Sequence, residues 1–316
     1  MLQQFLRKWS RGSTEGQSLL VLHVFNQQIK LLHAERAKQG WQLRTEQLVG
    51  ETKVFPENML QILSSLPPSG EVAVVLSPEL YQIIPLDKPN LPTETELLQA
   101  LPWLLKDLCP LAPEEMQLDY LDLTATAGAP AKINVVVAAK SSLQQLCEYL
   151  QQAKLGVTHI FAEELLSRDL VPVQGPTRLV LQQQPNNDLI LQVMRDGQLC
   201  FSRHLRGFQQ FLATPVTQLQ FGLFDNLLLE VQRSMDFVEG QLKLPPVREV
   251  LLLMAHPELE ALPALFHQAG FNQVRLMPLP EPWSWASQVD LQLWWPAIVA
   301  MATLMQTGEP SLEAAG

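Results

Sequence analysis

The order of apolar runs in the first quarter of the chain is the feature that most restricts its fold. Three runs typical of strands follow one another at Ser18 to Phe25, Ile29 to Glu35 and Trp41 to Leu48. A helix-length segment, Phe55 to Leu66, comes next and stops before two prolines and a glycine. The short apolar run Glu71 to Leu76 then predicts a buried strand. Strands followed by a helix and another strand indicate a mixed α/β fold.

The second half of the chain repeats this order in outline. We expect paired strands at Arg178 to Gln182 and Leu189 to Met194, and the Asp196-Gly197 pair predicts a tight turn into a third strand, Leu199 to His204. An amphipathic helix is expected over Val216 to Leu242. Two similar halves predict two lobes. The expected limits are an N-terminal segment at 1–16, a first lobe at 17–176, a second lobe at 177–306 and a C-terminal tail at 307–316.

An additional α/β unit is expected inside the first lobe, over about residues 93–160. Thr93 and Glu96 have the spacing of a capping box, so a helix should begin there. Pro102 should kink this helix, because its ring removes one backbone hydrogen bond. The elements expected next are strands at Met116 to Leu123 and Ile133 to Ala139 and a helix at Ser141 to Lys154.

The charge balance argues against nucleic acid as a partner. The 316 residues carry a formal net charge of −10, whereas phosphate binding requires concentrated Lys and Arg. The three cysteines show no C-x-x-C pattern, which favours a reducing compartment over disulfides or a zinc site. No secretory signal is visible, and the apolar segment Leu291 to Met305 is shorter than a membrane span and is interrupted by Pro296. We therefore expect a cytoplasmic protein with a buried helix in that segment.

The first eleven residues combine apolar and basic side chains. Leu2, Phe5, Leu6 and Trp9 fall on one face of a helix, with the basic residues elsewhere. A short basic amphipathic helix can lie on an anionic membrane surface, so these four residues are a candidate membrane contact. The alternative is a helix packed on its own domain or a frayed chain end, because a helix of about ten residues is marginal alone.

Several features of the inserted unit follow one another in a distinctive order. They are an apolar helix at Leu98 to Leu108, prolines at 110 and 113, the acidic pair Glu114-Glu115, Asp119-Tyr120 in a strand, and the strand Ile133 to Lys140. The later helix contains QRSMDF, residues 232–237. These features resemble PilM, the actin-fold scaffold family of type IV pilus machines. The resemblance implies a two-lobed actin-like fold of the PilM and FtsA type, with the unit at 93–160 as an inserted subdomain. The branch that serves the mannose-sensitive haemagglutinin (MSHA) pilus fits best.

The resemblance also locates where a nucleotide would bind. Actin-type ATPases hold phosphates between two hairpin turns with an Asp-x-Gly sequence, because glycine lets backbone amides approach. Residues 23–28 and 182–187 align with these turns, and neither stretch contains that sequence. The adenosine turn, usually Gly-Gly, falls at Met254-Ala255. The eroded positions are His23, Phe25, Gln182, Gln184, Met254 and Ala255. We therefore expect a pseudo-ATPase with no cofactor, and residual non-catalytic ATP binding is the alternative.

The resemblance further implies a partner. In the family, a cytoplasmic scaffold binds the N-terminal tail of a bitopic inner-membrane protein of the PilN type. That tail lies in a groove between the inserted subdomain and the first lobe. Here the groove is assigned only by region, to Glu94 to Ala139 and the strands before it. The pilus assembly ATPase is a second candidate partner, and these partners would recruit the protein to the inner membrane.

Two other functions stay open. An actin-fold ATPase or kinase with an atypical site would need a carboxylate in the cleft, for which Asp188 is the nearest candidate. A component like the cytoplasmic domains of type II secretion is the other, although such domains are fused to a membrane span. The histidines lack metal-ligand spacing, so neither a metal site nor a catalytic residue is expected. The late tryptophans are expected to pack the last helix, and the lining of a groove is the alternative; they are Trp283, Trp285, Trp294 and Trp295.

Overall fold

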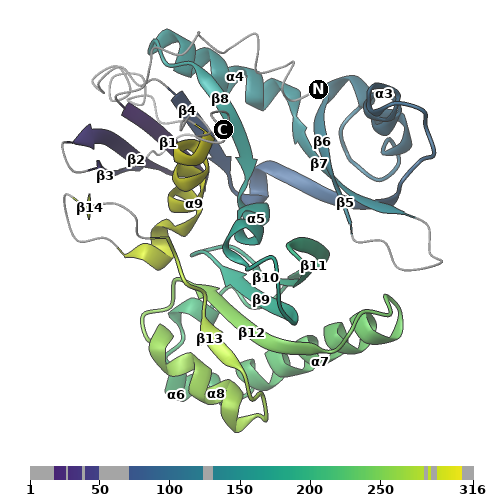
Figure 1. Cartoon of the computed structure of the whole chain (residues 1–316), viewed down its shortest axis with the longest axis vertical. Coiled ribbons are helices and arrows are strands. Elements are labelled where there is room, and N and C mark those ends of the chain that lie inside the picture. The colour runs from purple at the N-terminus through teal and green to yellow at the C-terminus, as the bar shows by residue number, and fades with distance from the viewer. Residues whose placement is uncertain are drawn as a thin grey trace, which may run out of the picture.

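The computed structural model describes residues 18–25, 28–37, 40–49, 71–123, 131–280, 284–285 and 290–307. The helix expected at 55–66, the candidate membrane residues Leu2, Phe5, Leu6 and Trp9, the C-terminal tail and Trp283 lie outside these residues. The described strands form three sheets (Figure 1).

The first sheet has the order β14-β3-β2-β1-β4-β8. Its strands are β1 (Ser18–Phe25), β2 (Gln28–Ala37), β3 (Gly40–Val49), β4 (Glu71–Leu76), β8 (Val157–Ala162) and β14 (Ser284–Trp285). β1, β2 and β3 are antiparallel neighbours, whereas β4 runs parallel to β1, and β8 runs parallel to β4. The expected strands β1 to β4 are confirmed, β2 and β3 being slightly longer than predicted.

Both faces of this sheet are covered. Leu20 and Leu22 pack with α4 (Lys140–Gln152), and Leu19 and Val21 pack with α9 (Leu291–Thr307). Strands buried on two faces have continuous apolar sequences rather than alternating ones, which is the pattern of β1 and β4.

The second sheet has the order β11-β10-β9-β12-β13. Its strands are β9 (Thr177–Gln183), β10 (Leu189–Arg195), β11 (Gln198–Leu205), β12 (Val247–Met254) and β13 (Val274–Leu276). The helices α6 (Val216–Leu219), α7 (Leu223–Gly240) and α8 (Leu262–Gln268) pack on one face. The prediction of a single helix over 216–242 is wrong. Gly222, at φ +105°, separates α6 from α7, and Phe221 before it is exposed.

The third sheet has the order β5-β7-β6 and is antiparallel throughout. Its strands are β5 (Tyr81–Asp87), β7 (Lys132–Ala139) and β6 (Met116–Asp122). The helix α3 (Glu94–Leu104) packs on one face through Leu97 and Leu101. As expected, Thr93 caps this helix, accepting a hydrogen bond from the Glu96 N–H at 3.2 Å. The sheet begins at β5, ahead of the expected start at residue 93, and β8 at the end of the expected unit belongs to the first sheet.

The last helix lies between the first two sheets. α9 contacts β1, β2 and β4 and also touches β12, and β14 pairs with β3. This segment, which belongs to the predicted second lobe at 177–306, therefore packs mainly on the first sheet. Trp294 and Trp295 are buried in the shared core, which confirms their packing role. None of the helices in the described ranges is long and apolar enough to cross a bilayer.

The remaining elements are short helical turns. They are α5 (Glu163–Leu166), η1 (Pro78–Leu80), η2 (Pro113–Glu115), η3 (Ser167–Leu170), η4 (Phe211–Ala213) and η5 (Leu259–Ala261). α5 follows β8 directly and faces the strands of the second sheet, so it joins the two lobes (Figure 1).

Candidate functional site

Two adjacent carboxylates mark the junction between the lobes. Glu163 and Glu164 begin α5 and are almost fully buried. Glu163 Oε2 lies 2.7 Å from Nε2 of His23, a side chain with no exposed surface in β1. A buried carboxylate is costly without a close partner, so this contact fixes the end of β8 against β1.

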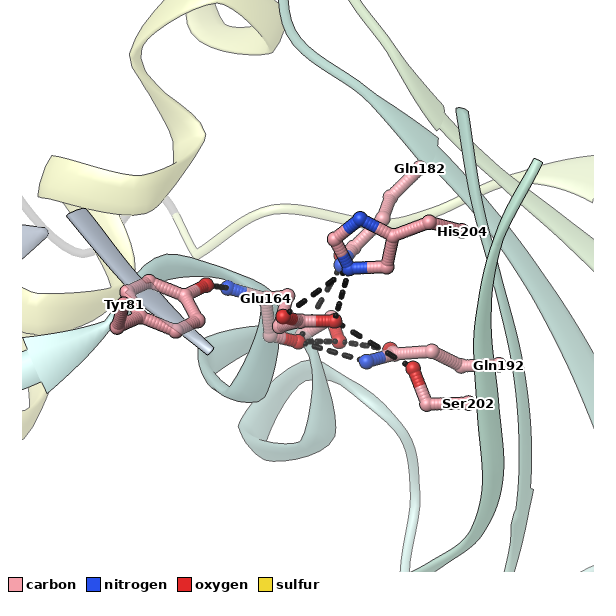
Figure 2. A network of polar contacts seen from close by, with 7 residues as sticks. Tyr81, Glu164, Gln182, Gln192, Ser202 and His204 are labelled. Carbon is pink, nitrogen blue, oxygen red and sulfur yellow. Dashed lines mark hydrogen bonds and ion pairs between the residues drawn. The ribbon is translucent and has the colours of Figure 1, made fainter. Parts of the chain in front are cut away.

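Glu164 holds the second sheet through both its main chain and its side chain (Figure 2). Its carbonyl oxygen accepts from Nε2 of Gln182 at 3.3 Å and from Nε2 of Gln192 at 2.9 Å. Its carboxylate lies 3.2 Å from Nε2 of His204 and accepts from Ser202 Oγ at 3.4 Å. The hydrogen bond to Glu164 raises the pKa of His204, so the protonated imidazole is favoured. We call Glu163, Glu164 and these partners the inter-lobe network.

Lys30 makes a second bridge between the lobes. Its Nζ donates to the carbonyl oxygen of Leu293 at 2.6 Å and to Oε1 of Gln184 at 3.4 Å. Gln184 Nε2 in turn donates to the carbonyl oxygen of Gln292 at 2.9 Å. Burial lowers the pKa of Lys30 to about 8, although Glu163 partly offsets this effect. Lys30, which follows the first aligned stretch, thus contacts Gln184 of the second, and both side chains are bonded to protein groups.

The depressed pKa of Lys30 predicts a specific pH dependence of stability. Between about pH 8 and 10.5 the unfolded chain holds the Lys30 proton and the folded chain does not, so the free energy of unfolding should rise with pH. The wild type should gain up to about 1 kcal/mol per pH unit over Lys30→Met between pH 8 and 10. Urea unfolding at several pH values measures this difference. Lys106→Met, which removes an exposed lysine, should show no such trend against the wild type.

The structure places the other eroded positions in the same region. Gln183 Nε2 donates to the carbonyl oxygens of Asn187 and Phe208. Met254 is buried at the end of β12, and the N–H of Ala255 donates to the Gln183 carbonyl at 3.4 Å. Phe25 ends β1, and its side chain lies outside the described part of the structure.

The described residues aligned with the second phosphate turn offer a nucleotide few free groups. The glutamine side chains at the end of β9 and directly after it are already bonded to the protein, and Pro185 has no amide hydrogen to donate. Next to the adenosine turn, His256 Nε2 bonds to the Thr214 carbonyl oxygen at 3.0 Å. Asp188, the candidate carboxylate of an atypical ATPase, accepts a hydrogen bond from Gln209. No cluster of three or more His, Cys, Asp or Glu side chains suited to a metal occurs within the described ranges.

A groove opens on the other side of α5, between the third sheet and the first lobe. It contains a cavity of about 240 Å³. Its walls include Val136 and Ala138 of β7, Ile160 of β8 and Leu165 of α5. In the described part of the chain, β6 and β8 each end their sheet, and residues of both strands line the cavity. The expected region, Glu94 to Ala139, supplies one wall of this groove, and residues 160–168 supply the opposite wall.

Known structures share this architecture, although no protein-family model matches the chain and no curated protein does. The PilM–PilN type IV pilus biogenesis complex is similar over 92% of this chain and 99% of that chain, with 19% identity and a TM-score of 0.66. A Bacteroides thetaiotaomicron protein with an actin-like ATPase fold is similar over 90% and 96%, with 12% identity and a TM-score of 0.52. The chain has an actin-like fold.

A third similar structure comes from another machine. The cytoplasmic domain of EpsL, an inner-membrane component of the type II secretion system of Vibrio cholerae, is similar over 90% of this chain and 95% of that chain. Its identity is 15% and its TM-score is 0.51. Within the actin-like fold, the inter-lobe network lies at the junction of the two lobes and the groove lies beside the third sheet.

Sequence reasoning missed the residues that join these two regions. Glu163 and Glu164 face the cleft, whereas Leu165 lines the groove, and all three belong to one turn of helix. Tyr81, which lines the groove, accepts a hydrogen bond from the N–H of Glu164 at 3.2 Å. Two adjacent acids directly after an apolar strand are the signal that could have indicated this junction.

Proposed function

We propose that this protein is a PilM-like, non-catalytic scaffold of type IV pilus assembly. In this proposal the groove binds the cytoplasmic N-terminal tail of a PilN-like inner-membrane protein. The observation that carries the proposal is an apolar groove bounded by the end strands of two sheets, in a fold shared with a PilM–PilN complex. As a finer assignment we propose the MshI branch, which serves the MSHA pilus. Tail binding would recruit the protein from the cytoplasm to the inner membrane.

The groove suits an extended peptide. A strand that ends its sheet has unpaired main-chain groups, and a peptide can add to such an edge while its side chains enter neighbouring pockets. The apolar walls, such as Val136 and Ile160, favour apolar side chains on the tail. No catalytic group is needed for this mode of binding.

We also propose that the cleft is a pseudo-ATPase site. The support is the contact of Lys30 with Gln184 and the bonding of the glutamine side chains at the end of β9 and directly after it to protein groups. The lower TM-score of the EpsL domain, 0.51 against 0.66, favours pilus assembly over type II secretion.

The variant Val136→Arg tests the groove. Val136 is half-buried on β7 and lines the cavity, so arginine would fill the space and place a charge on an apolar wall. Affinity for a synthetic PilN-type tail peptide should fall by about 100-fold, measured by fluorescence anisotropy. Gln82→Arg on β5, an exposed position in the same sheet, is the control and should bind as the wild type does.

Two further arms complete this experiment. Titration with a fluorescent ATP analogue and Mg²⁺ should give no signal, and binding with turnover would refute the non-catalytic assignment. A tail peptide from a type II secretion partner should bind more weakly than the PilN-type tail. Equal loss of binding in Val136→Arg and Gln82→Arg would contradict the groove as the binding site.

A further inference from the structure

Gln117 is a buried polar side chain in the apolar part of the groove. It lies on β6, is 5% exposed and lines the cavity. The flanking residues Met116 and Leu118 belong to the core under α3, so Gln117 lies on the opposite face of the sheet. Its register partner on β7 is Ala138, which also lines the cavity.

The amide nitrogen of Gln117 has no hydrogen-bond partner among the described residues. Leaving a buried donor unpaired costs about 1–3 kcal/mol, and native proteins satisfy most such groups. The adjacent apolar side chains cannot accept a hydrogen bond. Tyr81, a polar residue at the same cavity, already accepts from the N–H of Glu164. Gln117 therefore brings an unpaired amide to the wall of the cavity, and a turn of its terminal amide would present the donor to whatever enters.

The surroundings restrict what this donor can bind. A carboxylate brought among Val136, Ala138 and Leu143 would lose its hydration. Arg168, the cation at this cavity, is already paired with Asp169 at 3.4 Å. A neutral carbonyl oxygen costs less to bury and accepts from an amide N–H with good geometry. Ligand sites commonly combine apolar walls with a few such polar groups that fix the ligand's orientation.

We propose that Gln117 is a positioning residue for the docked tail, donating a hydrogen bond to a neutral carbonyl oxygen of that tail. The inference rests on the proposed function of the groove and adds the group that sets the register of the bound segment. The carbonyl comes either from the tail's main chain or from an Asn or Gln side chain. Both sources share the same chemistry, and they are separated by the peptides described below.

The test uses Gln117→Leu, which has a similar volume and lacks the amide. Affinity for the PilN-type tail peptide should fall about tenfold, while the melting temperature should stay equal or rise because an unpaired buried donor has been removed. A purely structural role would give the opposite pattern, a lower melting temperature with unchanged affinity. Gln82→Leu makes the same chemical change at an exposed position of β5 and should leave affinity unchanged.

Two series of tail peptides identify the acceptor. The first series replaces main-chain amides of the tail by esters one at a time, and the second replaces each Asn or Gln of the tail by Leu. One of these changes should weaken binding to the wild type and have no further effect on Gln117→Leu. An ester position with this behaviour assigns a main-chain carbonyl, and a Leu position assigns a side chain. If no change couples to Gln117→Leu, the inference is overturned.

The outcomes separate this inference from the proposed function. If the wild type does not bind the tail peptide, the proposed function fails and the inference fails with it. If the wild type binds, Val136→Arg loses binding and Gln117→Leu binds normally, the groove stands and the role of Gln117 is refuted.

Discussion

Replacing Glu163 by leucine should reduce the free energy of unfolding by about 3–5 kcal/mol. The carboxylate lies 2.7 Å from Nε2 of His23, and both side chains are almost completely buried. Leucine would take away the oxygen that His23 contacts and leave that polar ring against an apolar side chain. It would also remove the negative charge that favours the protonated form of Lys30. Urea unfolding with linear extrapolation measures the change.

Glu163→Gln provides the matched control for this prediction. Its amide keeps the shape of the side chain and one oxygen that can contact His23, so the loss should be clearly smaller, about 1–2 kcal/mol. If the leucine variant lost less than about 1 kcal/mol, the contact between Glu163 and His23 would contribute less to the free energy of unfolding than we predict. A similar loss for both variants would show that charge matters more than the hydrogen bond.

The variant Trp295→Ala should also cost about 3–5 kcal/mol. Trp295 is 1% exposed and packs in the core cluster that contains residues of both large sheets. Alanine would leave a large cavity there, and the surrounding strands can relax only partly because both sheets constrain them. The loss should appear in thermal and urea unfolding alike.

An exposed tryptophan gives the control. Trp103 on α3 is 66% exposed, so Trp103→Ala should change the free energy of unfolding by less than about 0.5 kcal/mol. Comparable losses at the two positions would contradict the burial of α9 against the first sheet.

Local sequence patterns predicted the strands well because the relevant forces are local. β4 was placed at its observed bounds, and β9 and β10 were placed within one residue at each end. The additional strand β5 was missed because Pro85 and several exposed residues interrupt its pattern. The break at Gly222 was missed because the apolar face continues through it.

The candidate site was only partly visible in the sequence, because its contacts join distant parts of the chain. Lys30 meets Leu293, and His23 meets Glu163, 140 positions away. The periodicity of apolar residues does not indicate which distant residues will pair. The resemblance predicts where the phosphate turns lie, and the structure adds that the glutamines of the second turn are bonded to α5 and α9. Gln117 could not be distinguished from a surface glutamine without its burial.

The bonds across the cleft also bear on how the two lobes respond to the cell. A bound nucleotide dissociates, so the arrangement of two lobes held together by a nucleotide depends on its concentration in the cell. The contacts across the junction here are made by side chains of one chain, such as Glu164, Gln184 and Lys30. The effective concentration of each side chain at its partner is therefore set by the fold and not by metabolism. For the scaffold proposed above, the arrangement of the lobes would then be independent of the nucleotide concentration, and the groove would keep the same shape in starved and growing cells.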